Sequence, residues 1–139
     1  METELIAPCG MNCNVCSAYL AFSRDLPKRK GNVKCKGCRP RNKQCAFVKK
    51  RCGDRLMKAE VHYCYECDDF PCEHVRKISA KYEKRWGVSF IENLKYIQEH
   101  GEKRFLAKER RKWKCEVCGG TVCIHNKKCY DHEHVETWK

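Results

Sequence analysis

Apolar residues recur at helical spacing through the second half of the chain. Val75, Ile78, Tyr82 and Trp86 lie three or four residues apart, which predicts a helix over residues 72–86 that ends at Gly87. A capping box at Ser89-Phe-Ile-Glu92 predicts a second helix to residue 100, and Gly101 separates it from a third over 102–112. The apolar stripes of these last two helices are expected to form core: Phe90, Ile91, Leu94 and Ile97, then Phe105, Leu106 and Trp113.

The pattern in the first half and at the C-terminal end is shorter and more interrupted. Asn12 is a candidate N-cap for a helix over 13–24, and Asp54 for a short helix to residue 60. A basic loop over 27–41 contains Pro and Gly. Residues 121–125 alternate as a strand does, and 126–128 form a turn, which predicts a short hairpin.

Cysteine is unusually frequent in the chain. The 139 residues include fourteen cysteines, 35% are charged, and the mean hydropathy is −0.78, so apolar burial alone supplies a thin core. Ten cysteines lie in residues 1–74 and four in 114–139. We therefore expect a small, metal-stapled, α-rich fold (α+β with few short strands), made of a zinc-knuckle module over 1–74, a helical connector over 75–113 and a zinc-ribbon-like tail over 114–139.

The spacing of the cysteines favours metal ligation over disulfides or buried free thiols. Four C-x2-C pairs occur, and such a turn directs two thiolates at one tetrahedral ion. The N-terminus has neither a basic nor an apolar signal region, and no apolar run is long enough to span a membrane. A cytoplasmic location, where thiols stay reduced, is the expectation. The four pairs are Cys13/Cys16, Cys35/Cys38, Cys64/Cys67 and Cys115/Cys118.

The tail contains the most compact set of candidate ligands. Cys115-x2-Cys118 and Cys129-x2-His132 bracket the predicted hairpin, the arrangement of a zinc ribbon with a Cys3His site. Cys123, His125 and His134 flank these pairs and are alternative ligands.

Ligand pairing among the ten N-terminal cysteines is less determined. Cys35, Cys38, Cys45 and Cys52 lie within eighteen residues, so a local site costs little loop entropy. The remaining six form two trios, each one ligand short of a tetrahedral site, which predicts a shared site. Its expected ligands are Cys13, Cys16, Cys64 and Cys67, with Cys9 and Cys72 in reserve. About three zinc ions are then expected in the whole chain.

Several ordered motifs resemble one family of cysteine-rich prokaryotic proteins of unknown function. The motifs are Cys9-Gly-Met-Asn-Cys13-Asn-Val-Cys16-Ser-Ala-Tyr19, then Cys35-Lys-Gly-Cys38, then Cys64-Tyr-Glu-Cys67-Asp-Asp-Phe70-Pro-Cys72, and the tail from Trp113 through Cys118-Gly-Gly. The resemblance implies zinc binding and an uncharacterised role. The chain departs from the family pattern at His132, where that pattern has a cysteine.

These observations predict a structural zinc protein that acts as a binding or adaptor module. Cysteine-saturated sites leave no open coordination position, so the sequence does not favour an enzyme. An iron–sulfur or redox protein is the first alternative, because Cys9-x3-Cys13-x2-Cys16 could ligate a cluster. A zinc-dependent nucleic-acid-binding protein is the second, given a formal charge of +12, which zinc-bound thiolates lower to about +7. No membrane partner is expected, and other partners are unknown.

Overall fold

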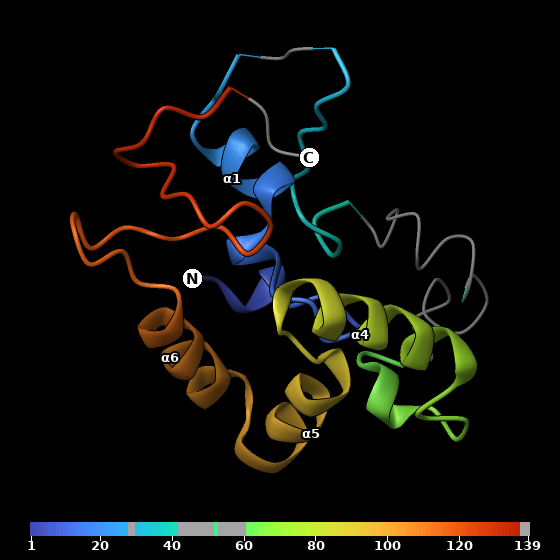
Figure 1. Cartoon of the computed structure of the whole chain (residues 1–139). Helices are drawn as coiled ribbons and strands as arrows, with labels where there is room; N and C mark the ends of the chain where they lie inside the picture. The colour runs from blue at the N-terminus through green and yellow to red at the C-terminus, as the bar shows by residue number, and fades with distance from the viewer. Residues whose placement is uncertain (28–29, 42–51, 53–60, 137–139) are drawn as a thin grey trace.

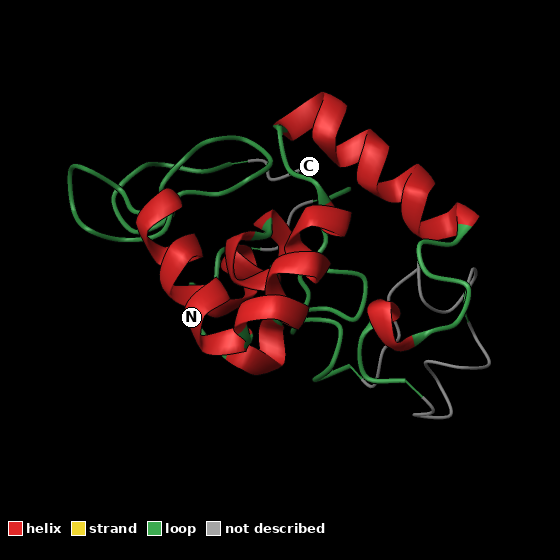
Figure 2. Ribbon diagram, turned by 90° about the horizontal axis from the view of Figure 1, so that it is seen from below, coloured by secondary structure: helices red, strands yellow, loops and turns green. Residues whose placement is uncertain are grey.

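The computed structural model describes residues 1–27, 30–41, 52 and 61–136. The described residues form a helix-rich fold with no β-strand, only three isolated β-bridges (Figure 2). None of the described helices is long and apolar enough to cross a lipid bilayer. The α-helices are α1 (Ser17–Ser23), α4 (Glu73–Trp86), α5 (Phe90–His100) and α6 (Glu102–Lys112), and short 3-10 helices span Thr3–Leu5, Cys13–Val15 and Cys64–Glu66.

The three long helices begin and end where the sequence predicts. Gly87 closes α4 in the left-handed conformation, with φ of 69°, which a glycine adopts without strain. The Ser89 hydroxyl accepts the backbone N–H of Glu92 at 3.2 Å and so caps α5. Gly101 separates α5 from α6. Local capping chemistry therefore sets the boundaries of this part of the fold.

The main core lies where the N-terminal segment meets α4, α5 and α6. Phe90 and Phe105 are fully buried in it. Asn12 donates to the buried carboxylate of Glu109 at 3.0 Å, and the Trp113 indole N–H donates to the same oxygen at 3.0 Å. A residue near the N-terminus is thereby joined to the last turn of α6, ninety-seven positions later.

The tail, residues 114–136, packs on α1 and forms a second, smaller core (Figure 1). The Ile124 backbone N–H donates to the Val15 carbonyl at 2.9 Å, which fixes the tail against the start of the chain. Arg24, just after α1, forms an ion pair with Asp131 of the tail. The buried residues of this second core are Leu20, Ala21, Cys123, Tyr130 and Val135.

Two expected elements differ from the structure. The helix expected over 13–24 is divided, because Cys16 is extended (φ −77°, ψ 135°) between the 3-10 turn and α1. The Ser17 N–H donates to His125 instead of to a preceding helical turn. The expected strand over 121–125 is reduced to two isolated bridges, Thr121 to Lys114 and Val122 to Cys129, and the His125 N–H donates to the Cys123 sulfur. The short helix expected over 54–60 lies outside the described residues.

Candidate metal centre

Four ligand groups of the tail converge on one point. The ligand atoms of Cys115, Cys118, Cys129 and His132 all lie within 4.8 Å of one another. The Cys118 and Cys129 sulfurs are 3.5 Å apart, and the Cys115 sulfur lies 3.6 Å from Nδ1 of His132. Sulfur ligands about 2.3 Å from a tetrahedral zinc are themselves about 3.8 Å apart, so these separations suit one shared ion. We call this group the tail site.

The first pair of ligands is held by a tight backbone turn. The Gly119 N–H donates to the Cys115 carbonyl at 2.9 Å, and the Gly120 N–H donates to the Cys118 sulfur at 3.3 Å. The Cys115 N–H in turn donates to the Gly120 carbonyl at 2.7 Å, which closes the loop. Gly119 adopts a φ of 77°. Such N–H···S bonds favour the thiolate form that binds metal.

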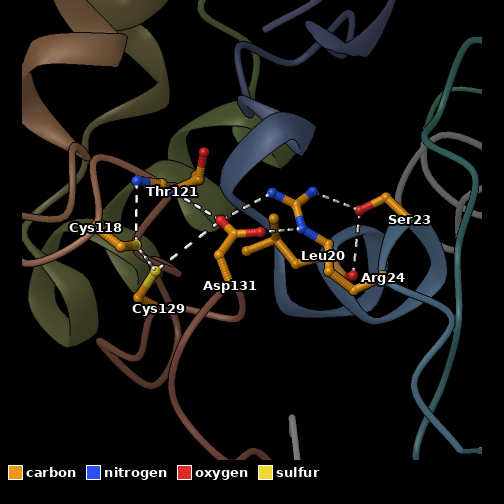
Figure 3. A network of polar contacts seen from close by, with 8 residues as sticks. Leu20, Ser23, Arg24, Cys118, Thr121, Cys129 and Asp131 are labelled. Atoms are coloured by element: carbon orange, nitrogen blue, oxygen red, sulfur yellow. Dashed lines mark hydrogen bonds and ion pairs between the residues drawn. The ribbon is translucent and has the colours of Figure 1, made fainter.

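Two carboxylates lie beside Cys129, and Figure 3 shows one of them, that of Asp131. The Cys129 N–H donates to the Glu133 carboxylate at 2.7 Å. Asp131 accepts the Thr121 N–H at 3.2 Å and the Arg24 guanidinium at 2.9 and 3.1 Å. Hydrogen bonds within the two turns that contain its ligands, and an ion pair with Arg24 at the end of α1, therefore hold the tail site in place.

The electrostatics of the tail site favour a cation. The pKa of Cys115 is lowered, first by the backbone N–H of Cys118 and then by that of Val117. The pKa of Cys129 is raised to about 11, chiefly by burial and also by the neighbouring Cys118 and Cys115 thiols. A divalent cation would relieve the repulsion among these thiolates, because metal ligation and thiol deprotonation are coupled.

The alternative tail ligands lie elsewhere. His125 accepts the Ser17 N–H through Nδ1 at 3.2 Å, and its Nε2 lies 3.2 Å from the Tyr82 hydroxyl. Burial lowers its pKa to about 4, with smaller contributions from Arg85 and Lys127. Cys123 is fully buried in the second core, and His134 contacts Glu136 at 3.2 Å on the surface. The spacing of the two ligand pairs favoured the four residues that converge, and the structure places these three alternatives away from them.

The structure places Cys13 and Cys16 next to cysteines of the basic loop. The pKa of Cys13 is raised mainly by burial, and the thiols of Cys16, Cys9 and Cys35 raise it further. Burial also raises the pKa of Cys16 to about 11, with Cys123 and Cys35 among its neighbours.

Cys64 and Cys67 have different neighbours. Burial raises the pKa of Cys64 to about 12, and the Cys52, Cys72 and Cys67 thiols add to that effect. In the described part of the chain, only the tail site brings three or more ligand atoms within 4.8 Å of one another. The two N-terminal ligand sets expected from sequence thus stay predictions, and Cys45 lies outside the described residues. None of the described cysteines is in a disulfide.

Comparison with protein families places part of the chain in a family. The model of the family described as "Protein of unknown function (DUF3795)" matches residues 5–77. The chain belongs to this family. Comparison with curated proteins and with solved structures gave no match.

The DUF3795 match covers only part of the chain that the structure describes. It contains the ten N-terminal cysteines, includes α1 and ends within α4. The tail site, from residue 115 to residue 132, lies beyond it. This DUF3795 chain therefore combines the segment that matches the family, which here contains ten cysteines, with a separate candidate metal centre that packs against it.

Proposed function

We propose that this DUF3795 protein binds zinc and that the ion in the tail site is structural. The main support for this proposal is the convergence of three thiols and one imidazole within 4.8 Å. Sulfur and nitrogen donors in a tetrahedral set are typical of zinc.

The donor set also supports a structural rather than a catalytic ion. Four protein ligands complete a tetrahedron and leave no position for water or substrate. The ion would connect the turn after α6 to the turn that pairs with Arg24, and thereby hold the tail against α1. We propose that the ions, about three per chain, stabilise a binding or adaptor module with the three parts expected from sequence. Reduced thiols of this number suit the cytoplasm.

Metal counting on two histidine variants tests the proposal. His132→Ala should lower the zinc content by one ion per chain, since it removes a ligand. His134→Ala is the matched control, because His134 is an exposed neighbour whose contact is with Glu136, and it should keep all the zinc. Equal zinc content in the two variants would contradict the assignment. Iron with acid-labile sulfide in place of zinc would support the iron–sulfur alternative.

Nucleic-acid binding is a second candidate, supported by a basic hollow beside the tail site. An open hollow of about 560 Å³ is lined by Arg111, Lys112 and Lys114 together with Cys115, Glu116 and Gly119. Phosphate recognition by such side chains is electrostatic and salt-dependent. Basic residues also occur at positions 28–29 and 49–51, which lie outside the described residues.

A salt titration tests this second candidate. Binding of single-stranded RNA should weaken as salt rises, and Arg111→Ala should lower the slope of log K against log salt by about 1. Lys81→Ala, an exposed basic residue on α4, is the control and should not change the slope. No binding at low salt would exclude this function.

A further inference from the structure

A small cavity beside the start of α4 is lined by four cysteines. Cys52, Cys64, Cys67 and Cys72 face it, and His74 reaches it as well. The space open to the centre of a water-sized sphere is about 20 Å³. A cavity of about 10–15 Å³ on this measure holds one water molecule, so the space suits a single ion and not a cluster of several metals.

Three of these thiols come from one tight stretch of backbone. The Cys67 N–H donates to the Cys64 carbonyl at 3.1 Å, and the Phe70 N–H donates to the Cys67 carbonyl at 3.0 Å. Cys72 is the N-cap of α4, where its carbonyl accepts the Arg76 N–H at 3.0 Å. The Cys64 N–H is fixed to the Pro8 carbonyl at 2.9 Å. The backbone thus directs three sulfurs toward one cavity from both ends of a nine-residue segment.

The rest of the lining is apolar. Val61, Phe70 and Val75 close the cavity, and Val75 is buried in the main core. Thiols gathered around an apolar space suit a soft or borderline ion such as zinc. No three of these ligand atoms lie within 4.8 Å of one another, so an ion would draw the sulfurs inward by side-chain rotation.

We propose that Cys52, Cys64, Cys67 and Cys72 bind one zinc ion, separate from the tail site. This grouping differs from the shared site expected from sequence, because Cys13 and Cys16 do not line the cavity. This second zinc site depends on the proposed function only in taking zinc as the bound metal.

Zinc counting on the full chain, purified without air, tests the grouping. Cys64→Ser and Cys72→Ser should each lose one zinc, and the double variant should lose the same single ion. Cys64→Ser combined with Cys13→Ser should lose two. If Cys13→Ser alone also loses one ion, loss of only one ion from that second pair would overturn the proposal and favour the shared site. Bound iron and sulfide at these cysteines would also overturn it.

Three further variants separate this site from misfolding and from the tail site. Cys123→Ser removes a buried thiol from the second core and should keep the zinc of the cavity. Cys72→His retains a metal donor, so it should keep the ion but shift the thiolate absorption of the cobalt-loaded protein. An unshifted spectrum would contradict ligation by Cys72. A Cys115→Ser background removes the tail ion. Loss of zinc from the cavity can then be measured separately from loss of zinc at the tail site.

A different observation points to a site between Cys13, Cys16, Cys35 and Cys38. The Gly37 N–H donates to the Cys35 sulfur at 3.4 Å, and the Cys38 N–H hydrogen-bonds the Cys13 thiol. The Cys35 N–H donates to the Ala18 carbonyl at 3.0 Å, which holds the loop against the start of α1. Two C-x2-C turns that face each other supply the four thiolates of a tetrahedral site.

We infer that these two turns share one zinc ion. Cys13→Ser and Cys35→Ser should each remove one ion, and the double variant should remove no more than either alone. Cys9→Ser is the matched control, since Cys9 is a buried neighbour outside the two turns, and it should retain the ion. Loss of two ions from the double variant, or of one from Cys9→Ser, would overturn this grouping.

Discussion

Asp131 connects two parts of the tail with the end of α1 through one carboxylate. It accepts from the Thr121 backbone and from the Arg24 guanidinium, and its Oδ2 lies 4.0 Å from the Cys129 sulfur (Figure 3). The Arg24 guanidinium holds the pKa of Asp131 below its usual range. A Cβ at Gly120 would collide with this carboxylate, so the glycine permits its close approach.

Asp131→Ala should therefore weaken zinc binding at the tail site. The expected loss is about tenfold in affinity, as for other groups that orient metal ligands. A chelator competition measures it. Arg24→Ala is the control, because it removes only a partly exposed ion pair worth about 0–1 kcal/mol and leaves the bond to Thr121. Equal loss in the two variants would mean that the ion pair, not the carboxylate, supports the site.

At the scale of elements, the N-terminal loop rests directly on α5. A Cβ at Gly10 would lie 2.5 Å from the Phe90 carbonyl oxygen and 2.9 Å from Cγ of Leu94. The Asn93 side chain also donates to the Gly10 carbonyl at 2.9 Å. Gly10 has a φ of 88°, so a larger residue there meets both a steric and a conformational obstacle.

Gly10→Ala should lower the free energy of unfolding by about 3 kcal/mol, from overpacking and left-handed backbone together. Gly87→Ala is a matched control, since its φ is also positive but nothing lies within 4 Å of its Cβ position. That variant should lose about 1 kcal/mol. Denaturant unfolding measures both, and equal losses would contradict the close packing of the loop on α5.

The Glu109 carboxylate joins α6 to the N-terminal segment. Glu109→Leu should destabilise the fold by about 2–4 kcal/mol, because it leaves the buried donors of Asn12 and Trp113 without their shared acceptor. Glu109→Gln keeps one acceptor oxygen and should lose less. Thermal unfolding compares the two, and a stable Leu variant would show that this contact contributes little.

Short-range signals made the helices and the tail ligands predictable. Gly87, the Ser89 cap and Gly101 act within a turn of the backbone, so the sequence locates α4, α5 and α6 directly. The bond from Asn12 to Glu109 and the packing of Tyr130 beside Leu20 join distant segments and have no local signature. The division of the expected helix at Cys16 depends on His125, which is equally remote in sequence.

At the scale of the whole molecule, the tail is the bridge between the end of α6 and α1. Removal of zinc by a chelator should increase amide hydrogen exchange in residues 115–132 and in α1. The interior of α5, buried in the main core through Leu94 and Ile97, should stay protected. Uniform loss of protection would instead show that the metal holds the whole fold together.

The pairing of the N-terminal cysteines could not be predicted from the sequence, because it too depends on contacts between distant segments. Spacing shows which thiols are adjacent in one turn, but not which turn faces another after folding. Cys64 and Cys13 each belong to a C-x2-C pair, and only the packed structure gives them different neighbours. The tail pairs were predictable because they lie on either side of one short hairpin.

The most direct test of a zinc ion in the tail is a crystal structure with anomalous diffraction measured on both sides of the zinc absorption edge. We predict a peak bonded to the sulfurs of Cys115, Cys118 and Cys129 and to Nδ1 of His132. No peak at that point, or a peak ligated by Cys123 or His125 with His132 facing solvent, would contradict it.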